Sequence, residues 1–326
     1  MKKIISLTLA IAMLCGCMLF AGCTNSQTAT TTEPDQAATG ESATGTSYSV
    51  GVCQLMKHDS LDQATQGFID ALTEAIEATG GTVDIDTQVA GDANLCTTVV
   101  NTFTAKNVDL IMGNATPALL AAANATTDIP VLGTSVTDYM DTFGGSIPAN
   151  VSGTSDAVPF AEQAQMMIDS LKLVAGDKVG VIYCTNESNS VVQYNAVKEL
   201  FEASGIVVEA YTFSESTELQ AVATSAAENS KAIYVPSDNT VAENDSVVGT
   251  ICNEKNVPVY TSYGGSICYA SLAIDYYQLG VETGKMAADI LLGNKSVSDI
   301  EVATLIPTVT YNQELCAQLG IEVPEN

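Results

Sequence analysis

From Tyr48 onward, short apolar runs typical of β-strands alternate with longer stretches in which apolar residues recur at the spacing of an α-helix. Short runs rich in β-branched residues predict strands, and the stretch after the first run has apolar residues at helical spacing, including Leu61, Phe68 and Leu72. Strands that alternate regularly with helices are typical of parallel βα units. The first series predicts strands at 47–55, 82–89, 108–113 and 129–135, with helices between them.

A second series of the same kind follows. It predicts strands at 177–184, 205–213, 231–237 and 257–262, with helices near 189–203, 216–229 and 240–254. Two consecutive series predict an α/β protein with two lobes, each a mainly parallel sheet flanked by helices. Three segments are expected to cross between the lobes and act as a hinge: 151–156, 271–275 and 303–312. The amphipathic stretch 276–292 then returns to the first lobe, so the predicted lobes are 48–153 plus 276–302 and 154–275 plus 303–326.

The N-terminus has the pattern of an export signal. Lys2 and Lys3 precede a short apolar run that ends in Ala21-Gly22 before Cys23, which resembles a bacterial lipobox. We therefore expect a lipoprotein-type signal peptide at 1–22, lipidation of Cys23 with Cys17 as the competing site, and a flexible polar tether at 23–47. This predicts an exported protein that a lipid anchor holds at the outer face of the bacterial cytoplasmic membrane.

The charge balance excludes several classes of partner and chemistry. The 326 residues include 38 Asp and Glu against 11 basic residues, all of them Lys, so the net charge is −27. Phosphate binding needs a basic surface, so we expect no nucleic acid partner. The single histidine, His58, excludes a site with two histidine ligands, and we expect no metal or cofactor. The common nucleophile-elbow, phosphate-loop, dinucleotide and zinc-protease motifs are missing, which predicts a protein that is not an enzyme.

The six cysteines after the signal segment leave their redox state open. They show no CxxC pattern, and two of them end apolar runs, so most are predicted to be buried thiols. An even count in an exported chain keeps three disulfides as the alternative.

Ligands of open parallel sheets bind beyond the carboxyl ends of the strands. In this chain the segments that follow the predicted strands are rich in hydroxyl, amide and carboxylate side chains. The sequence therefore predicts a polar ligand site in the crevice between the lobes.

Several of these segments resemble a known family. The stretches QLMKHDSLDQATQGFIDAL (54–72), GNATPALLAAANATTDIPVLGTSVTD (113–138), ESNSVVQ (187–193), YVPSDNTVA (234–242) and IDYYQLGVETGKMAADILLG (274–293) are similar to the TrpX-like substrate-binding lipoproteins of ABC importers. The resemblance covers nearly the whole chain from Tyr48. It implies the type I periplasmic-binding-protein fold and a small ligand of the amino acid type, most often an aromatic one. It also implies delivery to an ABC permease and its ATPase by a monomeric binding protein.

An amino acid ligand in such a site needs partners at both of its charged ends. For its carboxylate, hydroxyl groups and free amides at a helix N-terminus replace the missing arginine, and our candidates are Thr116, Ser135 and Thr137. For its ammonium group, Asp238 is the first choice. The alternative anions are Glu187, Asp138 and Asp275, and the further candidate contacts are Gln54, His58, Asn189, Ser190 and Asn239.

Each of these candidates has a structural alternative, and the function has rivals. Thr116, Asp238, Asn189 and Ser190 are also suited to helix capping, and Gln54 to a hydrogen bond at the sheet edge. Tyr139, Tyr183, Tyr263 and Tyr276 are candidates for an aromatic contact with the ligand. The same fold with a sugar or nucleoside ligand is one rival, although the chain has no Trp to stack on a sugar. A surface adhesin or sensor lipoprotein is the other.

Overall fold

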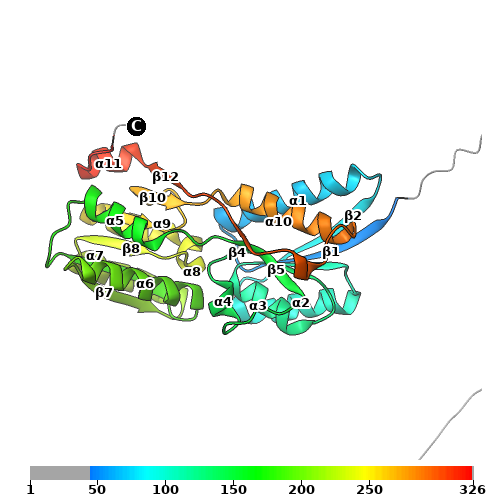
Figure 1. The fold of residues 1–326 in the computed structure, drawn as a ribbon. Helices are drawn as coiled ribbons and strands as arrows, with labels where there is room; N and C mark the ends of the chain where they lie inside the picture. Colours follow the sequence, from blue (N-terminus) through cyan, green and yellow to red (C-terminus); the bar gives the residue numbers. More distant parts are fainter. Residues whose placement is uncertain (1–44, 325–326) are drawn as a thin grey trace, which may run out of the picture. The chain divides into compact units, whose positions relative to one another are not determined.

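The computed structural model describes residues 45–324 (Figure 1). The expected signal peptide, Cys23, Cys17 and most of the expected tether lie outside these described residues. No helix within the described range is both long and apolar enough to cross a bilayer.

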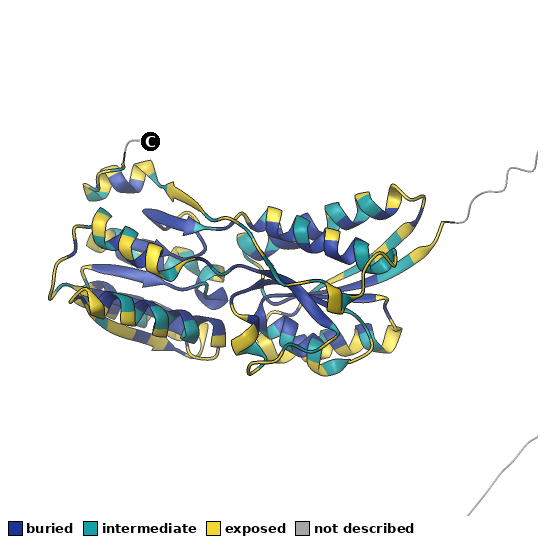
Figure 2. Cartoon of the chain, in the orientation of Figure 1, coloured by how far each residue is buried: buried dark blue, intermediate teal, exposed yellow. Residues whose placement is uncertain are grey.

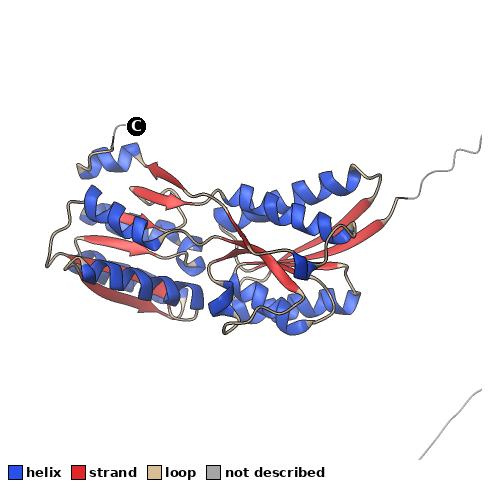
Figure 3. Cartoon of the chain, in the orientation of Figure 1, coloured by secondary structure: helices blue, strands red, loops and turns tan. Residues whose placement is uncertain are grey.

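Two six-stranded sheets form the framework of the described chain (Figure 3). The first is parallel throughout, in the order β11-β5-β4-β3-β1-β2. Its strands are β1 (Ser47–Gln54), β2 (Thr82–Val89), β3 (Leu110–Asn114), β4 (Val131–Val136), β5 (Val151–Ser155) and β11 (Ala303–Thr304). Its helices are α1 (Asp59–Glu77), α2 (Ala93–Lys106), α3 (Thr116–Ala125), α4 (Tyr139–Thr142) and α10 (Tyr276–Leu291), with the short 3-10 helix η2 (Val297–Asp299).

The second sheet has the order β12-β10-β9-β8-β6-β7 and is parallel except for the antiparallel pair β10 and β12. Its strands are β6 (Lys178–Cys184), β7 (Val207–Phe213), β8 (Ala232–Val235), β9 (Val259–Thr261), β10 (Ala270–Ala273) and β12 (Thr308–Tyr311). Its helices are α5 (Phe160–Ser170), α6 (Ser188–Ala203), α7 (Leu219–Asn229), α8 (Asn239–Glu243), α9 (Asp245–Lys255) and α11 (Gln313–Leu319), with η1 (Ser216–Glu218). The predicted α/β architecture of two mainly parallel sheets flanked by helices is confirmed, and it is a type I periplasmic-binding-protein fold.

The inner strands of each sheet are buried on both faces, as continuous apolar runs predict for parallel strands, whereas the edge strands β2, β7 and β12 are partly exposed (Figure 2). In the first lobe, Val50 and Val52 pack with Phe68 of α1 and Met286 of α10 on one face. On the opposite face Cys53 packs with residues of α2 and α3. All six cysteines of the described chain are buried and free.

Helix α10 is held against α1 by an unusually close approach of the two backbones (Figure 1). A Cβ atom at Gly280 would lie 2.0 Å from the carbonyl oxygen of Ala64, so only glycine permits this packing. The contact ties the chain that returns from the second lobe to the helix that follows β1.

The chain passes between the sheets in three short connections, and they differ from the expected crossings. Residues 151–155 form β5 in the first sheet and residues 270–273 form β10 in the second, so the expected crossings 151–156 and 271–275 are mostly paired strand. Ala303–Thr304 also pairs with β5, although residues after 302 were expected in the second lobe. The segments that connect the two sheets are therefore 156–159, 274–275 and 305–307, because the residues before and after them belong to strands or helices.

The expected helix 240–254 is two helices. Helix α8 ends before Asn244, whose φ of −118° departs from helical geometry, and α9 begins at Asp245. Helix α4, a single turn, is too short to give a periodic signal in the sequence.

Candidate functional site

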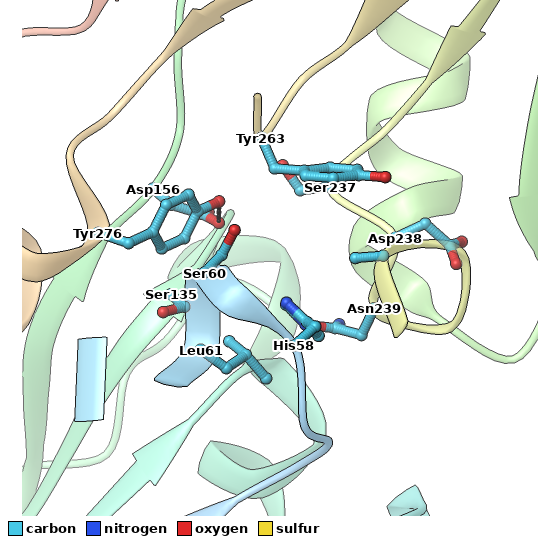
Figure 4. A pocket seen from close by; sticks show the side chains of 11 residues that line it. His58, Ser60, Leu61, Ser135, Asp156, Ser237, Asp238, Asn239, Tyr263 and Tyr276 are labelled. Atoms are coloured by element: carbon cyan, nitrogen blue, oxygen red, sulfur yellow. Dashed lines mark hydrogen bonds between the residues drawn. The ribbon is translucent and has the colours of Figure 1, made fainter. Parts of the chain in front are cut away.

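A pocket with an empty volume of about 270 Å³ lies between residues of the two sheets (Figure 4). That figure includes space open to solvent, and the side chains of the two lobes leave only about 10 Å³ that a water molecule could occupy. The first lobe and its connections contribute His58, Ser60, Leu61, Ser135, Asp156 and Tyr276, and the second lobe contributes Ser237, Asp238, Asn239, Ala242 and Tyr263.

Asp156 supplies a buried carboxylate to this pocket. It directly follows β5, in the first connection between the lobes. One oxygen accepts a hydrogen bond from the Thr137 hydroxyl at 3.1 Å and the other accepts one from the Tyr276 hydroxyl at 2.9 Å. None of the ion pairs formed by the described residues includes it. Burial raises the pKa of Asp156 above its usual value, although the two hydroxyl hydrogen bonds oppose this.

Ser135 and the start of α1 present hydrogen-bond donors to the same pocket. Ser135 has a φ of +56° beside an irregularity in the pairing of β4 with β5, and this strained backbone places the residue at the pocket. Its hydroxyl is buried without a partner among the described residues. The first turn of α1 reaches the pocket at Ser60 and Leu61, and no side chain caps this helix at His58. The unpaired amides of a helix N-terminus favour an anion.

Two aromatic rings form further walls of the pocket. Tyr276 is the first residue of α10, and Tyr263 follows β9 in the second lobe, where its ring lies across the pocket from His58 and Leu61 (Figure 4). Both are buried. Of the four predicted aromatic candidates, these two line the pocket. Tyr139 instead packs in the core of the first lobe with its hydroxyl on the carbonyl oxygen of Thr154, and Tyr183 stacks on Tyr194 in the second lobe.

His58 forms a direct bridge between the lobes. Its Nε2 atom lies 3.3 Å from Oδ1 of Asn239, at the start of α8. Burial lowers the pKa of His58, while Asn239 and the carboxylates of Glu187, Asp62 and Asp59 oppose that effect. Neutral His58 is therefore favoured in this arrangement.

The predicted anion Glu187 is engaged within the second lobe. Its two carboxylate oxygens accept hydrogen bonds from the backbone and side chain of Asn239 and of Thr240, at 2.7–2.8 Å. It thus fixes the N-terminus of α8 and holds Asn239 in place for His58. Glu187 does not line the pocket of Figure 4, but it lines a second, larger pocket whose walls include Leu55 and Met56 of the first lobe and Thr240 of the second.

Asp238, the first choice for the ammonium group, lines the pocket with its carboxylate turned away (Figure 4). One oxygen accepts from the backbone amide of Cys184 at 2.7 Å, and the other accepts from the backbone amide of Val241 at 2.9 Å as the cap of α8. Burial, followed by the nearby Glu187 carboxylate, raises the pKa of Asp238 well above its usual value. Asp238 therefore acts as the N-cap of α8, which was the structural alternative to a ligand contact.

Four other candidates lie away from the pocket. Asp138 and Asp275 are exposed caps of α4 and α10. Thr116 is buried at the start of α3 but does not line the pocket. Gln54 ties β1 to α1, because its amide donates to Asp62 and to the carbonyl of Met56 and accepts from Thr65.

The remaining candidates lie directly behind the pocket. Thr137 donates to Asp156, and Asn189 donates to the carbonyl oxygen of Ser237 at 2.8 Å. Ser190 is fully buried beside Asn189 in the first turn of α6. These residues support lining residues and do not form part of the lining themselves.

Asp156 is a pocket-lining carboxylate that the sequence analysis did not name as a candidate. It ends VSGTSD, the segment expected to serve only as a crossing. The available signal was its position, because it is the acidic residue directly after a strand of the first sheet. Two further lining residues that were not named as candidates, Ser60 and Ser237, lie in the segments that follow predicted strands. Within residues 45–324 no group of three or more His, Cys, Asp or Glu side chains is arranged to hold a metal.

Comparison with known proteins gives consistent matches. The family model of ABC transporter substrate-binding proteins matches residues 49–326. A tyrosine-binding protein of Clostridioides difficile (strain R20291) is 32% identical over 332 residues, which cover 98% of this chain and 93% of that protein.

Two solved structures extend the comparison. An ABC domain from Streptococcus pneumoniae in complex with L-Trp matches with a TM-score of 0.77 and 30% identity, over 84% of this chain and 96% of that one. A ligand-free, open substrate-binding protein with adhesive properties from Clostridium difficile matches with a TM-score of 0.65 and 34% identity, over 86% and 97%. With two lobes, a pocket between them and a family match across the described residues, the chain belongs to the ABC transporter substrate-binding protein family.

Proposed function

We propose that this protein binds an aromatic amino acid, of the tyrosine or tryptophan type, in the pocket between its lobes and delivers it to an ABC permease. The observation that carries the proposal is the buried Asp156 carboxylate, which faces the pocket without a cationic partner among the described residues. A buried anion of this kind is stabilised by a cation supplied from outside, such as a ligand ammonium group. The protein performs no reaction on its ligand.

The ammonium group of the ligand pairs with Asp156. The two hydroxyls that donate to its oxygens leave further acceptor capacity, since each carboxylate oxygen has two lone pairs. The ligand carboxylate then binds the free amides at the start of α1 and the unpartnered hydroxyl of Ser135. Each charge-assisted hydrogen bond contributes about 1.5–3 kcal/mol, so a few of them support micromolar binding without an arginine.

The aromatic side chain of the ligand lies near the rings of Tyr263 and Tyr276 and the apolar side chains of Leu61 and Ala242. Offset or edge-to-face contacts between rings contribute about 0.5–1.5 kcal/mol each beyond the burial of area. The names of the relatives support this ligand class, since one is a tyrosine-binding protein and another was solved with L-Trp. The higher TM-score to the L-Trp complex than to the open relative supports assignment of this conformation as closed.

Export and anchoring complete the proposal. The lipobox-like segment that ends at Cys23 would give a lipidated N-terminus, and the polar residues after it would tether the binding domain at the membrane surface. Metabolic labelling with a fatty acid should mark the wild-type protein and not Cys23→Ser. Labelling that persists in this variant and disappears in Cys17→Ser would move the lipidation to Cys17.

A thermal-shift screen of the purified domain against the twenty amino acids and a panel of sugars and nucleosides tests the ligand class. A ligand at about 100 times its Kd adds about 2.7 kcal/mol to the free energy of unfolding, so a true ligand shifts Tm clearly. We expect shifts with aromatic amino acids, to be followed by calorimetry. A shift only with a sugar or nucleoside would refute the assignment.

A second candidate function is adhesion, which does not exclude transport. It rests on one relative whose description includes adhesive properties. Binding of the purified domain to host cells or to matrix proteins, with and without the amino acid ligand, tests it. Absence of saturable binding would remove this candidate.

A further inference from the structure

Gln193 connects the second lobe to the carboxylate of Asp156 through Thr137. It lies on α6, and its side chain is buried behind the pocket. Its Nε2 atom lies 3.2 Å from the Thr137 hydroxyl in the first lobe, and its Oε1 atom accepts the backbone amide of Ser237 at 3.0 Å. Thr137 in turn donates to Asp156 at 3.1 Å. A series of hydrogen bonds therefore links Ser237 and Gln193 of the second lobe, through Thr137 of the first lobe, to the carboxylate of Asp156 in the pocket.

The chemistry of the groups involved fixes the donor and the acceptor in each of the three hydrogen bonds from Ser237 through Gln193 and Thr137 to Asp156. The Ser237 amide can only donate, so the atom of Gln193 that faces it is the oxygen, and the nitrogen faces Thr137. The Thr137 oxygen accepts that N–H, and its own hydrogen is directed to Asp156, because an ionised carboxylate can only accept. Hydrogen bonds in such a chain polarise and strengthen one another.

The contact depends on closure of the lobes. Thr137 follows β4 of the first sheet, whereas Gln193 belongs to α6 beside the second sheet. Separation of the lobes about their connections breaks the bond between Gln193 and Thr137, while Thr137 and Asp156 stay adjacent to the first sheet. Thr137 then loses the N–H that occupies one of its lone pairs and polarises its hydroxyl, and only the Asp156 carboxylate still orients that hydroxyl.

We propose that Gln193 is a positioning residue that, on closure of the lobes, orients Thr137 toward Asp156 and so strengthens the binding of the ligand ammonium group in the pocket. The inference rests on the proposed function, because it assumes that an ammonium group binds at Asp156. It adds a specific residue through which closure and ligand affinity are coupled.

The isosteric variant Gln193→Glu tests this role because it reverses one hydrogen bond and preserves the shape. A carboxylate at 193 still accepts the Ser237 amide, but it also accepts from Thr137 and turns that hydroxyl away from Asp156. We expect the affinity for the aromatic amino acid to fall roughly tenfold to a hundredfold at pH 8, mainly through faster dissociation. Without ligand the Tm should stay near that of the wild type, because the lost bond belongs to the closed state.

The pH profile separates positioning from a general structural effect. When the new carboxyl group at 193 is protonated it donates again to Thr137, so the ratio of variant to wild-type Kd should shrink from pH 8 to pH 5. The other titratable groups around the pocket are His58, Asp156, Glu187, Asp238, Tyr263 and Tyr276. They are present in both proteins, and their own effects largely cancel in the ratio.

Gln163→Glu is the matched control. Gln163 is also a fully buried amide, but its partners Tyr234, Ser262 and the carbonyl oxygen of Leu272 all belong to the second lobe. This variant should lower the Tm of the ligand-free protein, because a carboxylate oxygen then faces that carbonyl. Its ligand-induced Tm shift should remain close to that of the wild type.

The outcomes are distinguishable. If the wild type binds the amino acid and Gln193→Glu binds equally well, or if the Kd ratio is constant with pH, the role of Gln193 is refuted. A wild type that binds no amino acid refutes the proposed function itself. A Gln193→Glu protein with a low ligand-free Tm and an unchanged ligand-induced shift would show a merely structural role.

Discussion

The substitution Asp156→Asn removes the charge that we assign to the ammonium group while keeping the size of the side chain. The asparagine oxygen still accepts from Thr137, and its amide can donate to the hydroxyl oxygen of Tyr276, so the hydrogen-bonded frame persists. Removal of one partner of a buried charge pair typically costs about 3–5 kcal/mol. At 1.4 kcal/mol for each factor of ten, we expect at least about a hundredfold weaker binding.

The stability of the ligand-free protein should change in the opposite direction. Burial raises the pKa of Asp156, so the ionised carboxylate destabilises the ligand-free fold at neutral pH, and the neutral amide removes that penalty. We therefore expect an equal or higher Tm for the ligand-free variant. Calorimetric titration with the aromatic amino acid and thermal unfolding without it measure the two effects separately.

Asp275→Asn is the control for this experiment. Asp275 is an exposed cap of α10, and asparagine caps helices about as well as aspartate, so affinity and Tm should both stay near the wild-type values. If Asp156→Asn is folded and binds with unchanged affinity, the ammonium group does not bind there and the reasoning fails.

Three further predictions follow from the geometry. Affinity should fall from pH 8 to pH 5, because binding requires ionised Asp156, whose pKa is raised, and closure favours neutral His58, whose pKa is lowered. Calorimetry across this range tests it, and His58→Gln should reduce the slope. Gly280→Ala should destabilise the protein by about 1–3 kcal/mol, because the new Cβ would lie 2.0 Å from the carbonyl oxygen of Ala64. Denaturant unfolding measures this change. Glu187→Gln replaces an acceptor oxygen with a donor group at the start of α8, and should destabilise by about 2–4 kcal/mol in the same assay while also weakening ligand binding.

Each of these three has a clear contrary result. Constant affinity from pH 8 to pH 5 would mean that neither His58 nor Asp156 titrates with binding. Wild-type stability for Gly280→Ala would show that α1 and α10 can separate freely. Wild-type stability for Glu187→Gln would mean that the start of α8 does not depend on that carboxylate.

The fold was largely predictable because its signals are local. Buried parallel strands give continuous apolar runs, and the helices between them have a clear apolar face, so the order of elements follows directly. The expected crossings were less accurate, because whether residues such as Ala303 pair with a strand depends on a neighbour far away in the sequence. The split between α8 and α9 at Asn244 likewise gives no break in the apolar pattern.

The site was predictable in position and only partly in detail. His58, Ser135, Asp238 and Asn239 do line the pocket, as residues after parallel strands should. The direction in which a carboxylate points was not predictable, since the side chain of Asp238 accepts hydrogen bonds from amides of its own lobe and not from the pocket. Cap residues and ligand contacts share the same residue types, so the sequence alone does not separate them.

The location of Asp156 has a consequence for the order of events during capture. A group in the segment that joins two moving bodies is displaced least when they swing apart, so in the proposed mechanism the Asp156 carboxylate meets the incoming ligand before the second lobe closes over it. On this proposal the first contact of the ligand is electrostatic and is made with the first lobe alone. The proposal then places recognition of the ring second, when Tyr263 closes over the pocket, so a molecule with the wrong ring would leave before that stage.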